Sequence, residues 1–320
     1  MSPSKTLVPA VRHALPELFR SSHTSEKLTL EFFLAHIRNP NTRKAYATAA
    51  ADFARFAAAH GIASLTDVAP FHVAAYVEEL GTRLSAPSVK QKLAALRMLF
   101  DWLVVHQVIP TNPAHAVRGP KHVVKKGKTP VLSAEETREI FDAINTESVV
   151  GLRDRALIAV LVYAFARVGA AITMRVEDVY TQGKRTWVRL HEKGGKVHTM
   201  PAHHNLEAYL EAYLSVAELR SDPKGFLFRS TRGRSQCLSD RPLTQSDVWR
   251  MIRRRAGEAG IKTKIGCHSF RATGITEYLR NGGRLEVAQV MANHESPRTT
   301  RLYDRREDQI SLDEVERILI

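Results

Sequence analysis

The chain has 320 residues, of which 44% are hydrophobic and 25% charged, a balance typical of a globular protein with a packed core. Its 47 lysines and arginines outnumber 33 acidic residues, and the formal net charge of +14 favours a polyanionic partner, because neutralised phosphates release counterions. There is no signal-peptide pattern and no apolar run of about 18 residues, so we expect a cytoplasmic protein without membrane spans that works on nucleic acid. With only two cysteines, we expect neither a disulfide framework nor a four-cysteine zinc site.

The first part of the chain predicts an arm followed by a helical domain. Residues 1–25 show little periodicity and are expected to form a loosely held N-terminal arm. Over residues 26–110, apolar residues recur at helical spacing in TRKAYATAAADFARFAAAH, DVAPFHVAAYVEEL and SAPSVKQKLAALRMLFDWLVVHQV, and Ser85 or Ser88 is the expected cap of the last stretch. Helices of this length joined by short links predict an all-helical domain.

Residues 111–130 predict a basic linker. The stretch IPTNPAHAVRGPKHVVKKGKTPVL is rich in proline, which opposes a helix, and in lysine. Its composition suits a solvated tether and a segment that follows a phosphate backbone equally well.

Residues 131–320 predict a second domain that combines helices with a β-hairpin. Ser133 and Glu136 form a capping box for a helix through Ile144, and RDRALIAVLVYAFARVGAAITM is apolar nearly all round, as in a buried helix pair. RTWVRLHEKGGKVHTMP predicts a hairpin with its tip at Lys193–Lys196. The expected fold class is therefore mainly α with a small β-sheet (α+β), with further helices over His204–Glu218, Thr244–Ala259, His268–Leu279 and Leu285–Ala292.

Six residues of the second domain could carry chemistry if phosphate is the ligand. Five of the six also have an ordinary interpretation: an arginine that snorkels from a helix end or pairs with Asp178, a solvated turn lysine, a chance HxxR, and a half-buried tyrosine. The HxxR spacing places its histidine and arginine on one helix face. The six candidates are Arg167, Lys193, His268, Arg271, His294 and Tyr303.

Together these residue types cover the tasks of phosphoryl transfer from DNA to a hydroxyl. Guanidinium groups stabilise the negative transition state, and a tyrosine with a pKa of about 10 needs a base or electrostatic support. The leaving 5′-oxygen needs a proton, which a lysine or histidine can supply. No metal or cofactor is required, and in HTMPAHH the proline breaks any helical ligand spacing of the three histidines, so we expect none.

The order Arg, Lys, HxxR, His, Tyr resembles that of the tyrosine recombinase (phage integrase) superfamily. YAFARVGAAITMRVEDV resembles its first-arginine box, and HEKGGKVHTMP resembles its hairpin with the catalytic lysine. CHSFRATGIT and VAQVMANHESPRTTRLYDR resemble the second and third boxes. The preceding helical segment is similar to the core-binding (SAM-like) domain of the family.

The resemblance implies a site-specific recombinase that integrates, excises or resolves a DNA element. The two arginines and His294 would hold the scissile phosphate, Lys193 would act as general acid, and His268 would assist proton transfer. Tyr303 would attack and form a 3′-phosphotyrosyl link, and strands would exchange through a Holliday junction. The partner would be a double-stranded recombination site. The protein would be monomeric off DNA, would form a homotetramer in the synapse, and would be associated with the nucleoid.

Basic residues outside the catalytic set are candidates for DNA contact. They lie on the predicted helices and in the linker, and those that follow Trp249 suit a solvated helix face as well as a helix in the major groove. The candidates are Arg43, Lys44, Lys90, Lys121, Lys125, Lys126, Arg250, Arg253 and Arg254.

The chain departs from the family pattern at two places. Many members carry an acidic residue three positions after the first arginine, where this chain has Ala170, so the orientation that the acid provides must come from elsewhere or be absent. The usual LGH of the third box reads ANH here. The amphipathic tail SLDEVERILI suits docking on a neighbouring protomer and packing on its own domain equally.

Two other functions remain open at this point. A degenerate relative could keep the DNA clamp without chemistry, although its catalytic set would then be expected to be incomplete. A topoisomerase of the same chemistry would relax supercoils without a partner duplex; the helical first domain favours a recombinase, by analogy.

Overall fold

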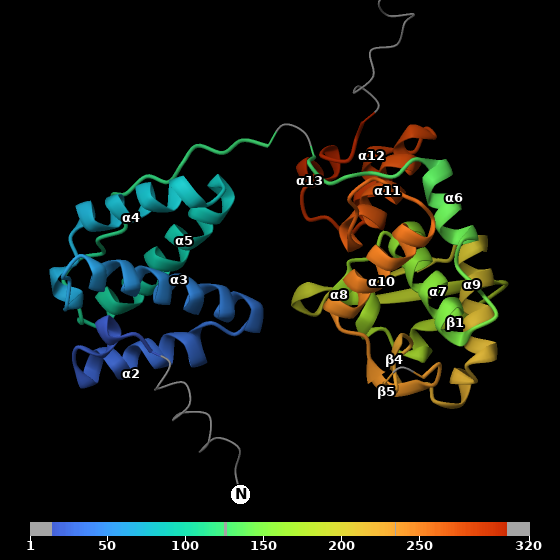
Figure 1. The fold of residues 1–320 in the computed structure, drawn as a ribbon, viewed down its shortest axis with the longest axis horizontal. Coiled ribbons are helices and arrows are strands. Elements are labelled where there is room, and N and C mark those ends of the chain that lie inside the picture. The colour runs from blue at the N-terminus through green and yellow to red at the C-terminus, as the bar shows by residue number, and fades with distance from the viewer. Residues whose placement is uncertain (1–14, 125–126, 234, 306–320) are drawn as a thin grey trace, which may run out of the picture. The chain divides into compact units, whose positions relative to one another are not determined.

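The computed structural model describes residues 15–124, 127–233 and 235–305. The chain divides into two compact units, Met1–Val123 and Val124–Ile320, and this division falls within the stretch predicted as a linker. Helices dominate both units, and the described strands all belong to the second unit (Figure 1), which confirms the expected fold class.

The first unit is a bundle of helices around an aromatic core. The long helix α3 begins behind Asn39, whose side chain accepts hydrogen bonds from the amides of Asn41 and Thr42. The rings of Phe53, Tyr76 and Phe100 are buried between the helices. The elements are η1 (Glu17–Arg20), α2 (His23–Glu31), η2 (Phe32–His36), α3 (Pro40–Ala59), η3 (Leu65–Asp67), α4 (Pro70–Arg83) and α5 (Ala86–Val105).

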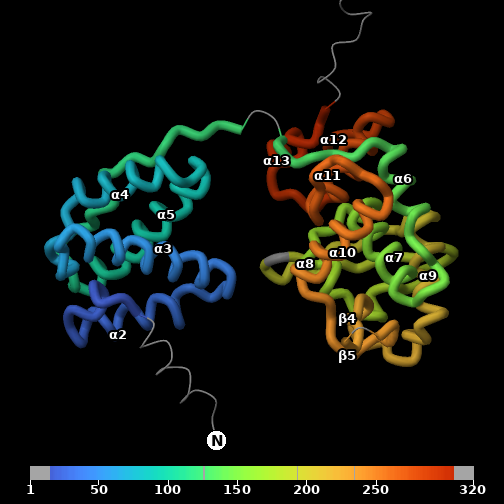
Figure 2. Tube along the Cα trace, in the orientation of Figure 1, coloured from blue at the N-terminus to red at the C-terminus, as the bar shows by residue number. Residues whose placement is uncertain are grey.

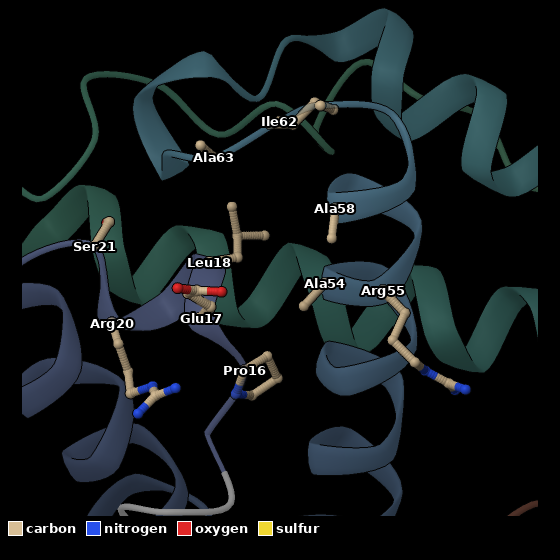
Figure 3. Close-up of a pocket in the computed structure, with 11 residues that line it drawn as sticks. Pro16, Glu17, Leu18, Arg20, Ser21, Ala54, Arg55, Ala58, Ile62 and Ala63 are labelled. Atoms are coloured by element: carbon tan, nitrogen blue, oxygen red, sulfur yellow. The ribbon is translucent and has the colours of Figure 1, made fainter.

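The N-terminal arm predicted over residues 1–25 is too long. Leu18 and Phe19 are buried in the core of the first unit, and α2 already begins at His23 behind a Ser22 cap. Figure 3 shows this N-terminal segment beside α3, where a pocket lies between it and Ala54 and Ala58. A single 3₁₀ turn has no hydrophobic period, which is why the sequence pattern does not reveal it.

The first part of the predicted linker also packs on the first unit. Ala114 and Val117 are buried in its core, and the Arg97 guanidinium donates a hydrogen bond of 3.1 Å to the Ala114 carbonyl oxygen. Prolines prevent a helix here but not burial, so composition places the start of the linker too early.

The second unit is built around the buried helix α7 (Val149–Tyr163). The predicted capping box is confirmed at α6 (Ala134–Asp142), where Ser133 and Glu136 each accept a hydrogen bond from the backbone amide of the other. The other helical elements are α8 (Val168–Thr173), η4 (Val176–Asp178), η5 (Lys193–Gly195), α9 (His204–Val216), η6 (Leu219–Ser221), α10 (Gln245–Glu258), α11 (Cys267–Arg280), α12 (Leu285–Met291) and α13 (Pro297–Arg301).

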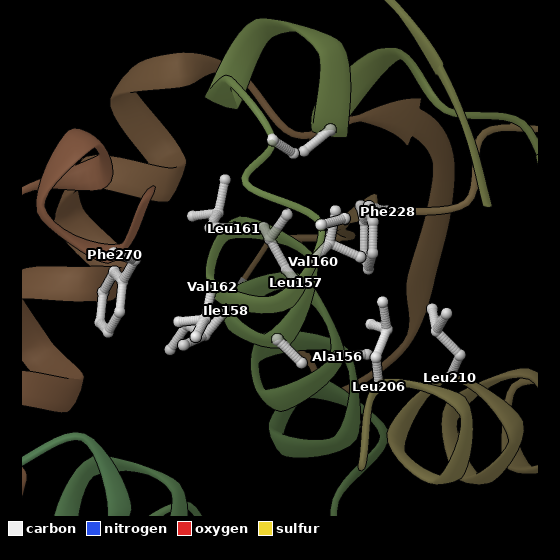
Figure 4. Packing of buried hydrophobic residues seen from close by; sticks show 14 of the residues in the cluster. Ala156, Leu157, Ile158, Val160, Leu161, Val162, Leu206, Leu210, Phe228 and Phe270 are labelled. Carbon is white, nitrogen blue, oxygen red and sulfur yellow. The ribbon is translucent and has the colours of Figure 1, made fainter. Parts of the chain in front are cut away.

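Helix α7 packs against α9 on one side and α11 on the other. Figure 4 shows its apolar side chains between Leu206 and Leu210 of α9 and Phe270 of α11. Gly274 lets α11 approach closely, because a Cβ atom at this position would collide with the carbonyl oxygen of Val162. Figure 2 shows α12 and α13 beside α11, at the end of the described chain.

Two small antiparallel sheets complete the second unit. The predicted hairpin is confirmed as β2 (Arg185–His191) and β3 (Val197–Pro201), with Val188 opposite Met200. Strand β1 (Val179–Gln182) extends it to the order β1-β2-β3, and β4 (Arg229–Thr231) pairs with β5 (Leu238–Pro242). We did not predict β1, β4 or β5, because strands of three to five residues with mixed polarity lack a clear alternation. A membrane-crossing helix, which needs greater length and apolarity, does not occur among the described residues.

Candidate active site

Two turns with left-handed backbone shape the site. Phe165 has a φ of 48° and turns the chain from α7 into α8, so that Arg167 becomes the N-cap residue of α8. Asn293 has a φ of 47° and directs the chain from α12 to His294. A left-handed Phe is costly and suggests a constrained, functional turn, whereas Asn tolerates this conformation well. Asn293 thus accommodates the departure from the glycine of the family motif.

Arg271 lies at the buried centre of the site, with 1% of its surface exposed. Its guanidinium donates hydrogen bonds to the carbonyl oxygens of Phe165 and Ala292 and, at 2.8 Å, to Nε2 of His294. Burial lowers the pKa of Arg271 to about 10, with the nearby charge of Arg167 adding to the effect, so the group stays cationic at neutral pH. The buried Nε of Arg271 has no hydrogen-bond partner among the described residues, and the guanidinium interacts with the nearby Tyr303.

His294 is held as a neutral imidazole. Its Nε2 accepts from Arg271, so Nδ1 carries the proton and donates to Oγ1 of Thr300 at 2.9 Å. Burial lowers the pKa of His294 to about 3, helped by the charges of Arg271 and Arg167. The ring stacks on Tyr303 with centroids 5.7 Å apart. His294 therefore orients Arg271 and the tyrosine ring without adding charge.

Tyr303 follows α13 and is 8% exposed. Its hydroxyl lies 2.6 Å from Nε2 of His268, and its carbonyl oxygen accepts a 2.9 Å hydrogen bond from Thr276. Burial lowers the pKa of His268, which leaves a neutral ring able to accept the phenolic proton. Burial raises the pKa of Tyr303, and the charges of Arg271 and Arg167 oppose that rise by favouring the phenolate. The geometry suits proton transfer from Tyr303 to His268.

Arg167 occupies the more open side of the site. Its Nη1 donates a 2.7 Å hydrogen bond to Glu192 Oε2, and not to Asp178, the partner that the sequence suggested. Asp178 instead accepts from the Arg175 amide at 2.8 Å. Lys193 follows Glu192 directly in η5, so its backbone lies beside the partner of Arg167. The side chain of Lys193 lies outside the part of the chain that the structure describes.

Five of the six predicted residues therefore come together, and three further contributors were missed. Glu192 stands beside Lys193 in the hairpin motif, where its charge was the available signal. Thr276 and Thr300, which support Tyr303 and His294, have no recognisable signal, because the contacts arise only in the folded chain.

Most of the described candidates for DNA contact are exposed, but three arginines already have protein partners. Arg43 donates to the Ile37 carbonyl oxygen at the end of η2, at 2.9 Å. Arg250 pairs with Asp247, and Arg254 pairs with the buried Asp154 at 2.9 Å. The exposed candidates are Lys44, Lys90, Lys121, Arg250, Arg253 and Arg254. Lys125, Lys126 and the C-terminal tail over residues 306–320 lie outside the described residues.

Metal-ligating side chains do not gather in the described ranges, where no group of three or more His, Cys, Asp or Glu could hold an ion. His203 stacks on Tyr163, and its ring packs at a tilt against that of His204, so these two histidines have packing roles.

Two protein-family models match the chain. Residues 130–309, more than half of it, match the model described as the phage integrase family. Residues 30–107 match the phage integrase N-terminal SAM-like domain. Each match falls largely within one of the two compact units.

Similar proteins include tyrosine recombinases of several bacteria. Tyrosine recombinase XerC of Myxococcus xanthus is 27% identical over 292 residues, covering 88% of this chain and 93% of that protein. A tyrosine recombinase of Pseudothermotoga lettingae is 26% identical over 292 residues, covering 90% of this chain and 96% of that protein.

Solved structures share the fold at low sequence identity. λ integrase residues 75–356 bound to DNA gives a TM-score of 0.65 at 18% identity, covering 89% of this chain and 98% of that one. A λ integrase tetramer bound to a Holliday junction gives a TM-score of 0.66 at 19% identity, covering 89% of this chain and 79% of that one.

Proposed function

The chain belongs to the phage integrase family, as a recombinase that cleaves and rejoins DNA at specific sites, and we propose that Tyr303 is its nucleophile. The observation that carries the proposal is the 2.6 Å hydrogen bond between the Tyr303 hydroxyl and His268, beside the buried cation Arg271. A phenol becomes a nucleophile when a neutral base takes its proton and nearby cations stabilise the phenolate, and His268 with the two arginines supports both tasks.

The proposed cleavage step exchanges one phosphate ester for another. His268 takes the phenolic proton, the Tyr303 oxygen bonds to phosphorus, and the bond from phosphorus to the 5′-oxygen breaks. Lys193 gives that oxygen its proton and leaves a free 5′-hydroxyl. Arg271 and Arg167 stabilise the charge on the nonbridging oxygens, and His294 keeps Arg271 in place.

Rejoining is the reverse of this step with a different hydroxyl. The 3′-phosphotyrosyl ester keeps the energy of the cleaved bond, so a 5′-hydroxyl of the partner duplex can attack it without ATP. The catalytic tasks fall to protein side chains, and the proposed mechanism uses no metal ion.

We also propose a biological role that follows the family pattern. We assign to the chain the integration, excision or resolution of a DNA element at the nucleoid, by a protein that is monomeric off DNA and forms a homotetramer in the synapse. The similarity to a λ integrase tetramer bound to a Holliday junction supports this assembly.

A nicked suicide duplex tests the nucleophile. Duplexes that the protein binds are first selected from a randomised pool, and a nick placed next to the scissile phosphate then traps the covalent adduct. Wild type should form an adduct whose DNA-linked peptide contains Tyr303, and Tyr303→Phe should form none while binding DNA normally. Tyr278→Phe, a matched change on α11, should react like wild type.

The same material separates the alternatives. A wild type that binds the selected duplex but forms no adduct would be a clamp without chemistry. A protein that forms the adduct and relaxes supercoiled plasmid, yet never joins strands of two duplexes, would be a topoisomerase. An adduct on another residue would overturn the assignment of Tyr303.

A further inference from the structure

The acid that holds Arg167 comes from an unexpected position in the chain. Position 170, where many family members carry an acid, holds a buried alanine in α8. The carboxylate of Glu192, 25 residues after Arg167, instead accepts the 2.7 Å hydrogen bond from Nη1. Among the described residues, this is the hydrogen bond that the Arg167 side chain makes.

Burial shows on which side of the guanidinium the carboxylate lies. The Glu192 side chain is 4% exposed, whereas the Arg167 side chain is 41% exposed. The carboxylate is therefore the buried partner of the pair and the guanidinium the more exposed one. The printed bond uses Nη1 of Arg167, so we expect a phosphate to bind the exposed part of the guanidinium without displacing Glu192.

Glu192 also supplies negative charge next to the two arginines of the site. Its charge acts on Arg271 and on His198 as well as on Arg167. Arg271 is held by backbone carbonyl oxygens and a neutral histidine, so it brings no carboxylate of its own. Charge repulsion between two neighbouring arginines would otherwise tend to drive the exposed Arg167 outward.

Glu192 is fixed by the hairpin that carries Lys193. Its amide donates a 2.7 Å hydrogen bond to the Lys196 carbonyl oxygen, and the left-handed Gly194 and Gly195 close the turn between them. An ion pair at this point ties the tip of the hairpin to the start of α8.

We propose that Glu192 is the positioning residue of Arg167, replacing the acid absent at position 170, and that it couples Arg167 to the hairpin of Lys193. The inference rests on the proposed function, because Arg167 must act on the scissile phosphate. Glu192 itself touches neither the phosphate nor the nucleophile in this proposal.

The first test is the single-turnover rate of adduct formation on the suicide duplex. Glu192→Gln keeps the shape but removes the charge, and a charge-assisted hydrogen bond is roughly twice as strong as a neutral one, so we expect cleavage about tenfold slower. The Kd for the duplex and the thermal melting temperature should stay unchanged. Glu207→Gln is the matched control, because Glu207 binds Thr186 at the opposite end of β2.

A double-variant cycle shows whether Glu192 acts through Arg167. If it does, Glu192→Gln should have little further effect in an Arg167→Ala background, because the group that it positions is gone. A second arm adds Ala170→Glu to Glu192→Gln, which returns a carboxylate to the position used by other family members, and partial recovery of the rate is expected.

The outcomes distinguish the inference from the proposed function. Unchanged cleavage by Glu192→Gln, or an undiminished effect without Arg167, would overturn the positioning role while the Tyr303 adduct of wild type stands. Faster cleavage or tighter DNA binding by Glu192→Gln would also overturn it, because Glu192 would then compete with the phosphate. Absence of any wild-type adduct would instead remove the proposed function.

Discussion

The two arginines of the site are held in opposite ways. Arg271 is 1% exposed and bound by two backbone carbonyl oxygens and a neutral histidine, whereas the Arg167 side chain is 41% exposed and bound by a buried carboxylate. The buried arginine keeps its full charge for a ligand, because its partners are dipoles. The charge of the exposed arginine is partly neutralised by its carboxylate partner, and the same ion pair fixes its position.

This difference divides the work of binding one phosphate. A buried cation held by fixed dipoles acts strongly on a transition state, because little water is present to screen its charge. A cation at the rim is screened by water and needs a fixed partner to point in a useful direction. Arg271 therefore provides the main electrostatic stabilisation, and Arg167 provides a second cation whose orientation is fixed by its partner.

The largest expected effect that tests this comparison is on stability. Arg271→Ala leaves three buried acceptors without their donor, namely the carbonyl oxygens of Phe165 and Ala292 and Nε2 of His294. Each such loss costs about 1–3 kcal/mol, so we expect the free energy of unfolding to fall by about 3 kcal/mol or more. Urea denaturation followed by circular dichroism measures the change.

Arg167→Ala is the comparison variant for that experiment. Its side chain is already half-exposed, so water can reach Glu192 in its place, and a loss of about 1 kcal/mol is expected. Equal losses in the free energy of unfolding for the two variants would contradict the distinction between the buried Arg271 and the exposed Arg167.

A second prediction concerns the pH dependence of the buried side. The pKa of His294 is about 3 in the folded protein, against about 6.5 for an unperturbed histidine in the unfolded chain. Between these values the unfolded chain binds a proton that the folded one does not, so stability falls as the pH is lowered below about 6.5. The contribution of His294 is about 1.4 kcal/mol per pH unit and ends near pH 3.

His294→Gln isolates this contribution, because glutamine keeps hydrogen-bonding capacity but does not titrate. The free energy of unfolding of wild type should fall more steeply than that of the variant between pH 6.5 and pH 5. The two slopes should differ by about 1.4 kcal/mol per pH unit. Parallel pH profiles would mean that His294 is charged or solvated in the folded protein.

Local patterns in the sequence predicted the part of the fold that local interactions determine. The capping box of Ser133 and Glu136 lies within one helical turn, and the hairpin follows from a glycine pair between two β-rich runs. The order of the catalytic residues pointed to the site through the family resemblance. Five of the six then came together in the structure, at the N-cap of α8, on α11 and in the segments after α12 and α13.

The sequence was weaker where charged groups find partners far along the chain. Arg254 looked like part of a solvated or DNA-facing helix surface, yet its partner Asp154 is 100 residues away and buried. Glu192 was passed over for the same reason, since nothing in a hairpin motif says which helix its acid will meet. Such ion pairs depend on packing between elements, which neither periodicity nor composition encodes.

The smallest expected effect concerns the backbone of the nucleophile on the buried side of the site. Thr276 is fully buried, and its hydroxyl donates to the Tyr303 carbonyl oxygen at 2.9 Å. Thr276→Val keeps the shape but removes this bond, so we expect a loss of about 1 kcal/mol in stability.

Thr273→Val, one turn earlier on α11, should cost a similar amount, because the Thr273 hydroxyl accepts from the Leu132 amide at 3.0 Å. Only Thr276→Val should slow adduct formation, by about threefold to tenfold, because it alone loosens Tyr303 from His268. If both variants slow cleavage equally, general destabilisation explains the effect and the anchoring of Tyr303 by Thr276 is not needed for reactivity.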